Sequence, residues 1–374
     1  MNSLFSIIIP CFNQGIYLTD CLNSLLEQSY ENWEAVVVND GSSDNTQHIA
    51  EDFQRKDSRF KLINQNNAGL SSARNMGLQN ATGHRFIFLD ADDYLYPTTL
   101  AEISKVVRIC DENTLIQYGY TYVSEDKKRL LREVLPKESD SLFPHILKEV
   151  PGPCNSICIS NELVKKIGVF DITLKSLEDW DFWLRAAKCG ASVKYIQTSL
   201  VHYRYVKNSM SRNAFVMYRS YKEVALRAPQ KDPRISEEYF ENRNYIYDNS
   251  QTIQNALLRM LGVSVMQGKI DESVSFFKQE TQIPIEKHAI SQFDQMCSYL
   301  TFRYWYQPNE IKEVIESVRP KFEEFFNQLE VNYHLQNKIL FLIFRRHLFF
   351  ENIYKYGNIK GRIKNYFLRK KNSI

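Results

Sequence analysis

The chain has 374 residues, 44% of them hydrophobic and 24% charged, with a formal net charge of +3 at pH 7. This length exceeds one ordinary domain and supplies a sizeable core, while the near balance of charge argues against nucleic acid as a partner. The apolar runs fall well short of the ~20 residues that cross a bilayer, which argues against a processive synthase that extrudes its own polymer. The seven cysteines are odd in number and scattered along the chain, and we expect no signal peptide. Both features indicate a cytoplasmic location.

In the first half of the chain, apolar runs alternate with helical patterns. Strands are expected near 6–9, 35–39, 60–63 and 86–89, with helices at 14–28, 46–54, 71–80 and 98–109 between them. This alternation is typical of an α/β fold with a mostly parallel sheet flanked by helices. Further along, a strand is expected at 154–160 and a helix at 178–189.

Three of the expected strands end in polar or acidic residues. The strand near 86–89 leads into Asp90-Ala91-Asp92-Asp93, that near 35–39 into Asp40, and that near 6–9 into Pro10-Cys11-Phe12-Asn13. Crowded carboxylates repel one another, so the acidic run is expected mainly where Mg²⁺ or Mn²⁺ binds together with phosphates. In an open α/β sheet, ligands bind beyond the carboxyl ends of the strands, so these junctions can face one crevice. A polar turn would explain one such junction but not its repetition.

Five segments in this order resemble the family 2 glycosyltransferases, which are inverting enzymes with a GT-A fold and nucleotide-sugar donors. The segments are 7–13, 38–44, 67–75, 90–93 and 178–185. The resemblance covers about residues 5 to 212. It implies a GT-A catalytic domain over 1–212, followed by a separate helical region over 213–374, where the pattern becomes tyrosine-rich, charged and helical.

The resemblance also implies which residues bind the nucleotide. Asp40 would accept a hydrogen bond from the N3–H of uracil, and backbone groups around Pro10 and Phe12 would flank the base. Arg74 would bring positive charge to the nucleotide, since it follows a Gly-Leu-Ser-Ser helix start where anions are favoured. The remaining expected nucleotide contacts are Asn13, Asp90 and Ala91.

For the metal, the resemblance implies that Asp92 is a direct ligand and that Asp90 holds the ribose or a metal-bound water. Asp93 would be a second ligand or would cap the next loop. A cation there would act as a Lewis acid on the leaving diphosphate and replace a general acid. Many relatives carry a histidine where this chain has Val206, and His202 would point elsewhere on an extended strand, so the third protein ligand stays open.

The expected general base is Asp179, at the start of the helix at 178–189, with Glu178 as its competitor. Adjacent helical residues point about 100° apart, so only one of the two can face the reacting carbon. The family pattern favours Asp179, and Glu178 would then contact the acceptor or support the structure. Asp181 fits a helix-dipole role better, Trp180 is expected to stack on a sugar of the donor or acceptor, and Trp183 is expected in the core.

Together these features predict transfer of a sugar, with a UDP-sugar as the expected donor, to a hydroxyl of a saccharide or lipid-linked saccharide in cell-surface polysaccharide assembly. A sugar nucleotidylyltransferase is the alternative enzyme, although residues 10–13 offer no glycine-rich loop for a triphosphate. A non-catalytic scaffold that binds nucleotide is the other alternative.

After Glu351 the chain has seven basic residues, no acidic residue and interleaved aromatic residues. Such a tail can contact the anionic inner face of the cell membrane, or it can be a solvated end. The sequence leaves these two interpretations open.

Overall fold

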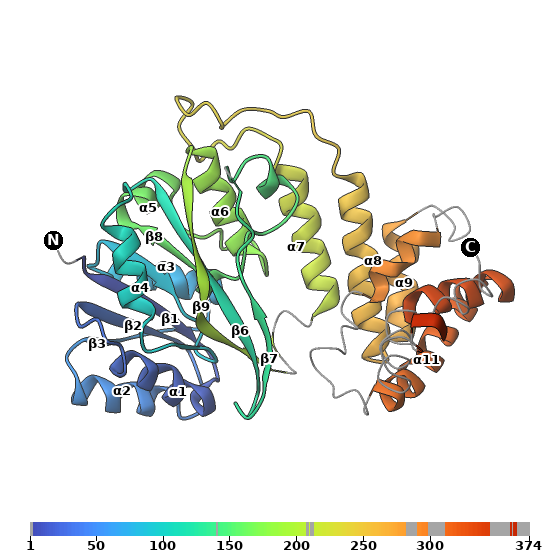
Figure 1. The fold of residues 1–374 in the computed structure, drawn as a ribbon, viewed down its shortest axis with the longest axis horizontal. Helices are drawn as coiled ribbons and strands as arrows, with labels where there is room; N and C mark the ends of the chain where they lie inside the picture. The colour runs from blue at the N-terminus through green and yellow to red at the C-terminus, as the bar shows by residue number, and fades with distance from the viewer. Residues whose placement is uncertain are drawn as a thin grey trace. The chain divides into compact units, whose positions relative to one another are not determined.

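The computed structural model describes residues 3–139, 141–206, 209, 213–281, 290–297, 311–344, 360 and 362–364. The chain forms two compact units, one of Met1–Lys207 with Glu223–Tyr247 and one of Asn208–Lys222 with Asp248–Ile374 (Figure 1). The segment Glu223–Tyr247 therefore belongs to the first unit, although Asn208–Lys222, which precedes it in the sequence, belongs to the second. The sequence analysis expected a single boundary after residue 212, whereas the two units of the structure exchange segments at 208–222 and 223–247.

The first unit contains a nine-stranded sheet in the order β3-β2-β1-β4-β8-β6-β9-β5, with β7 paired to β6. The first four strands are parallel, as the sequence predicts, and β8 runs antiparallel to both β4 and β6. The strands are β1 (Phe5–Cys11), β2 (Trp33–Asp40), β3 (Phe60–Gln65), β4 (Arg85–Phe88), β5 (Tyr94–Leu95), β6 (Thr114–Ser124), β7 (Leu130–Val134), β8 (Ile157–Ser160) and β9 (Ser192–Tyr205).

Helices cover both faces of this sheet (Figure 1). Leu18 of α1, Phe53 of α2 and Ile103 of α4 pack in one core with alternate residues of β1 and β2, whereas Ala73 of α3 packs with Val36 on the other face. The expected helices are confirmed. They are α1 (Gly15–Leu26), α2 (Thr46–Lys56), α3 (Leu70–Asn80), α4 (Thr99–Val107) and α6 (Glu178–Lys188), and α5 (Asn161–Ile167) is a further helix that was not expected.

The strand order places the site. The chain builds β2 and β3 on one side of β1 and then crosses to form β4 on the other side, so the order reverses between β1 and β4. All seven residues of β1 are buried, which fits a central strand covered on both faces. Ligands of such sheets bind at the carboxyl ends of the strands beside the reversal, where the acidic run 90–93 follows β4.

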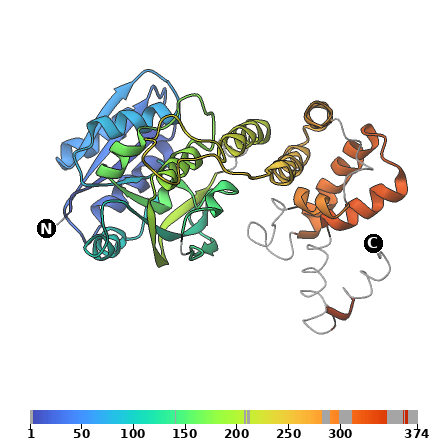
Figure 2. The same ribbon diagram turned by 90° about the horizontal axis from the view of Figure 1, so that it is seen from above.

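The second unit is helical among its described residues (Figure 2). Its helices share one apolar core, in which Gly262 lies so close to the backbone of Met296 that a Cβ would lie 2.1 Å from the carbonyl oxygen. The elements are α8 (Ser250–Met266), α9 (Ile270–Glu280), η5 (Ile290–Cys297), α11 (Ile311–Gln328) and a helix over 333–344, and α7 (Ala214–Arg227) begins in this unit. A helical C-terminal region is therefore confirmed.

Across the described residues we find no helix with the length and apolarity needed to cross a membrane. The basic tail lies outside the described residues except for 360 and 362–364, so its expected membrane contact stays a prediction.

Candidate active site

The turns that follow β1 and β2 are joined by Asn13. Its side-chain oxygen accepts a hydrogen bond from the backbone N–H of Ser43 at 2.8 Å, and its own N–H donates to Ser42 Oγ at 3.0 Å. Asn13 has a φ of 52°, a left-handed conformation that asparagine tolerates better than most residues. Next to it the ring of Phe12 is 48% exposed, while Pro10 is buried within β1. Phe12 therefore offers an open aromatic surface, and the Asn13 side chain fixes the loop that presents it.

Asp40 ends β2 and is only 3% exposed. Its carboxylate accepts hydrogen bonds from the N–H of Ala68 at 2.8 Å, the N–H of Gly69 at 2.9 Å and the amide of Gln65 at 2.7 Å. These bonds hold the turn before α3, in which Gly69 has a φ of 92° that favours glycine. A carboxylate has about four acceptor positions, so one remains for an external donor such as an imide N–H.

Arg74 of α3 connects two acidic segments that lie far apart in the sequence. Its buried guanidinium donates to Asp90 Oδ1 at 2.8 Å and to Glu178 Oε1, and it lies over the ring of Phe170. Charged hydrogen bonds of this kind are about twice as strong as neutral ones. The end of β4 and the start of α6 are therefore held together, as the sequence analysis requires for a single site. Arg74 reaches any ligand there through Asp90.

The members of the acidic run have different surroundings. Ala91 is fully buried in the core, so its side chain offers no ligand contact. Asp93 is buried and accepts hydrogen bonds from the backbone N–H of Arg204 at 2.7 Å and from the amide of Asn155. Burial, with the nearby Asp92 carboxylate, raises the pKa of Asp93 well above its ordinary value. Asp93 thus fixes the loop to β9 and η2 (Cys154–Ser156).

Asp92 is less buried than Asp93 and has no ion pair in the part of the chain that the structure describes. Burial and then the Asp90 carboxylate raise its pKa to about 7, despite a hydrogen bond from Gln14 and the nearby Arg204. The Asp90 side chain is 32% exposed. A pair of carboxylates of this kind fits a hard divalent cation.

The described side chains do not supply a complete set of metal ligands. In the part of the chain that the structure describes, no three His, Cys, Asp or Glu side chains are arranged to hold an ion. His202 is stacked between the rings of Tyr94 at 4.3 Å and Tyr96 at 3.8 Å, and burial lowers its pKa to about 4. It is a neutral packing residue, in line with the expectation that it points elsewhere. A cation held by Asp90 and Asp92 would complete its shell with phosphate or water oxygens.

Arg204 is a site residue that the sequence analysis missed. Its buried guanidinium donates to the carbonyl oxygen of Asp92 at 2.8 Å, to Asp20 Oδ2 at 2.8 Å and to the carbonyl oxygen of Glu125 at 3.1 Å. It therefore fixes the backbone of the acidic run from β9. The available signal was the Tyr203-Arg204 pair, which lies just before Val206, the position where many relatives carry a histidine.

The two acids that open α6 differ in their partners. Glu178 is 4% exposed and paired with Arg74. Asp179 is partly buried, accepts a hydrogen bond from the N–H of Trp180 at 2.8 Å and has no ion pair among the described residues. Burial and then the Glu178 carboxylate raise its pKa to about 7. A general base works best with a pKa near the operating pH, so Asp179 is better suited to this role than Glu178.

The tryptophans of α6 belong to the core. Trp180 is 0% exposed, and its Nε1 donates to the carbonyl oxygen of Ile146 at 2.8 Å. This position does not support the expected stacking of Trp180 on a sugar, because neither face of the ring is open. Trp183 is also 0% exposed, as expected, and packs beside Phe88.

Asp181 is the third acid of the first turn of α6 and is fully buried. Three arginines surround it: Arg185 at 3.2 Å, Arg227 at 3.3 Å and Arg234 at 2.7 Å. The last two belong to the segment Glu223–Tyr247. This segment, which the sequence analysis did not connect with the site, therefore stabilises the helix that carries Asp179.

The comparisons with known proteins agree with this geometry. Residues 6–159 match the family model described as glycosyl transferase family 2. The putative glycosyltransferase EpsH of Bacillus subtilis is 32% identical over 209 residues, which are 53% of this chain and 60% of that protein. An uncharacterized glycosyltransferase of Rickettsia typhi is 36% identical over 192 residues, which are 49% of this chain and 58% of that protein. The chain thus spans about three fifths of these relatives.

The solved structure of residues 1–349 of S. aureus TarS in complex with UDP-GlcNAc is similar in fold. The TM-score is 0.51 at 20% sequence identity, and the likeness covers 95% of this chain and 92% of that one. The same TarS segment in complex with UDP gives the same TM-score. The predicted GT-A fold is therefore confirmed.

Proposed function

We propose that the chain is an inverting glycosyltransferase that moves a sugar from a UDP-sugar to a hydroxyl of a saccharide or lipid-linked saccharide in cell-surface polysaccharide assembly. One observation carries the proposal. Asp92 and Asp179, two carboxylates without an ion pair among the described residues, stand at the two ends of the Asp90–Arg74–Glu178 bridge. Carboxylates of this kind, at the switch point of an α/β sheet, indicate a functional site.

The donor side of the proposal rests on the turns after β1 and β2. The exposed ring of Phe12 offers an aromatic surface to the base, and the remaining acceptor position of Asp40 matches the N3–H of uracil. UDP and UDP-GlcNAc are the ligands named for the TarS structures, which share the fold. We therefore infer a UDP-sugar as the donor.

Asp90 and Asp92 would hold Mn²⁺ or Mg²⁺. Their oxygen donors, the exposure of Asp90 and the lack of an ion pair at Asp92 fit a hard cation whose remaining ligands are diphosphate and water oxygens. Such a cation would supply Lewis-acid stabilisation of the departing diphosphate. Arg204 and Asp93 would keep the backbone of the run in place.

Asp179 would act as the base in a single displacement. Its carboxylate takes the proton of the acceptor hydroxyl as the oxygen bonds to the anomeric carbon and the bond from that carbon to the diphosphate oxygen breaks. Attack opposite the leaving group inverts the configuration. Glu178, neutralised by Arg74, would position Asp179.

A screen of nucleotide-sugars for metal-dependent hydrolysis, with NMR detection of the released anomer, tests this function. We expect a UDP-sugar to be consumed only when Mn²⁺ or Mg²⁺ is present and the anomer to be opposite to that of the donor. Formation of a nucleoside triphosphate from added pyrophosphate would favour a nucleotidylyltransferase. A lack of turnover and of metal-dependent nucleotide binding would favour a scaffold.

We also propose peripheral attachment to the inner face of the cell membrane through residues 352–374. The support is the tail's excess of basic residues with interleaved aromatic residues. Deletion of 352–374 should release the protein from anionic vesicles and leave donor hydrolysis unchanged. Equal sedimentation of the truncated and full chains with such vesicles would contradict the attachment.

A further inference from the structure

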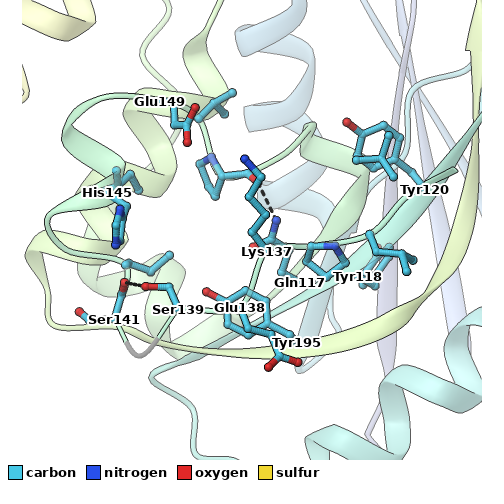
Figure 3. A pocket seen from close by; sticks show the side chains of 17 residues that line it. Gln117, Tyr118, Tyr120, Lys137, Glu138, Ser139, Ser141, His145, Glu149 and Tyr195 are labelled. Atoms are coloured by element: carbon cyan, nitrogen blue, oxygen red, sulfur yellow. Dashed lines mark hydrogen bonds between the residues drawn. The ribbon is translucent and has the colours of Figure 1, made fainter. Parts of the chain in front are cut away.

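A cavity of about 390 Å³ lies in the first unit and contains none of the acidic residues discussed above. Residues of β6 and β9 line one side of it, and residues within 134–139 and 141–151, which include the short helix η1 (His145–Leu147), line the other. Figure 3 shows Ser141 and His145 lying opposite Gln117 and Lys137 across the opening. The volume is that of a small-ligand site.

The lining combines aromatic and hydrogen-bonding side chains. Tyr120 and Tyr195 contribute rings, and Gln117 and His145 contribute donors and acceptors. A sugar presents apolar C–H faces to aromatic rings and hydroxyl groups to such polar side chains. The charged residues of the lining are Lys137, Glu138 and Glu149. This small excess of negative charge disfavours an anionic ligand such as a nucleotide.

The strand register places this cavity beside the acidic run. Ile87 of β4 and Ile116 of β6 both pair with Cys158 of the intervening β8. Tyr118, which follows Ile116 by two residues, is therefore level with the last residue before Asp90. Two strand spacings of about 4.8 Å separate them across the sheet.

The wall of the cavity is also fixed to the helix that carries the proposed base. Trp180, the residue after Asp179, donates from Nε1 to the carbonyl oxygen of Ile146 at 2.8 Å. At the other end of the wall, Gln117 donates to the carbonyl oxygen of Pro151 at 2.6 Å. Four residues later, Asn155 donates to Asp93. The wall is thus held between the two acidic segments of the site.

We propose that this cavity binds a neutral saccharide unit of the acceptor and so directs one of its hydroxyls toward Asp179. The assignment as the acceptor subsite rests on the proposed transferase function. The binding of a neutral saccharide follows from the cavity itself. It accounts for a lining that contains three tyrosines and the amide of Gln117 at a point where the nucleotide contacts are absent.

Saturation-transfer NMR on the full chain tests the binding, with maltotriose and the β-1,4-linked trimer of GlcNAc as neutral probes and a sulfated disaccharide as the anionic probe. At least one neutral probe should bind, and its binding should persist in excess UDP with Mn²⁺. Glu149→Trp, at an exposed position of the lining, should block the opening and weaken binding roughly tenfold or more. His145→Ala should give a smaller loss without adding bulk. Glu162→Trp on the exposed face of α5 is the matched control and should bind like the unmodified chain.

Four results would overturn the proposal. These are displacement of the neutral probe by UDP, unchanged affinity in both cavity variants, preference for the sulfated probe, and no binding of a neutral probe up to its solubility limit. Nucleotide-sugar turnover is measured separately on the same protein. Intact probe binding without any turnover would reject the transferase function and retain the saccharide site.

Discussion

The two ends of the first turn of α6 show how differently this protein treats neighbouring carboxylates. Asp181 is fully buried and surrounded by Arg185, Arg227 and Arg234. Asp179, two residues earlier, has no ion pair among the described residues, and its pKa is raised to about 7 by burial and by Glu178. A buried charge that is compensated within the protein supports the structure, whereas an uncompensated one is available for a ligand or a proton.

The acidic run after β4 shows a related difference in hydrogen-bond partners. Asp93 accepts hydrogen bonds from the N–H of Arg204 and the amide of Asn155, while Asp92 forms no ion pair among the described residues, and burial raises the pKa of both carboxyl groups. Each acidic segment therefore contains at least one carboxylate that holds the structure and at least one that is left for chemistry. The substitutions below test this division.

Asp179→Asn should have the largest effect on catalysis. Loss of the base should lower transfer by roughly 10²–10⁴-fold, while UDP affinity should change little because a base acts on the acceptor. Steady-state kinetics and nucleotide titration measure the two quantities. A larger loss from Glu178→Gln, or retention of the donor's anomeric configuration, would show that the base is assigned to the wrong residue.

Asp92→Asn should lower transfer roughly 10²-fold or more, because it removes a ligand of the proposed cation and with it several kcal/mol of charge stabilisation. UDP binding should weaken only when metal is present. Activity assays with Mn²⁺ and with EDTA test this. Full activity of the unmodified chain in EDTA would contradict a metal role for Asp92.

The pH dependence should follow from Asp179. A base must be ionised to accept a proton, and the pKa of Asp179 is raised to about 7, so kcat/KM should increase with pH up to about 7 and level off above it. Below the midpoint the rate should fall roughly tenfold per pH unit. The pKa of Asp92 is also raised to about 7, so the test is made at saturating Mn²⁺, which would keep Asp92 ionised, and the residual activity of Asp179→Asn should then lack this inflection. A flat profile between pH 5 and pH 8 in the unmodified chain would count against an ionisable base with this pKa.

Asp181→Asn should affect stability more than chemistry. Removal of one partner from a buried ionic cluster costs roughly 3–5 kcal/mol, because uncompensated arginines remain. Thermal unfolding should show a lower Tm, and transfer at temperatures below unfolding should fall less than in Asp179→Asn. The control is Asp52→Asn, which breaks an exposed ion pair with Arg55 and should cost about 0–1 kcal/mol. Equal Tm values for the two variants would contradict the structural role of Asp181.

The order of the elements and the strand ends that carry Asp40 and Asp90 could be predicted from the sequence, because apolar runs and their periodicity are local signals. The partners of these acids could not. Arg74 and Glu178 are 104 residues apart, and Arg234 and Asp181 are 53 residues apart, so no local pattern links them. The role expected for Trp180 also depended on which side of α6 is open. That helix is buried on nearly all sides, and its periodicity does not identify an exposed face.

Calorimetric titration of the full chain with UDP, with and without Mn²⁺, tests the central claim most directly. The claim is that carboxylates without an ion pair bind a cation together with a diphosphate. We expect Mn²⁺ to strengthen UDP binding in the unmodified chain and in Asp181→Asn, and to have no effect on UDP binding in Asp92→Asn. Equal UDP affinity with and without Mn²⁺ in the unmodified chain would contradict this account.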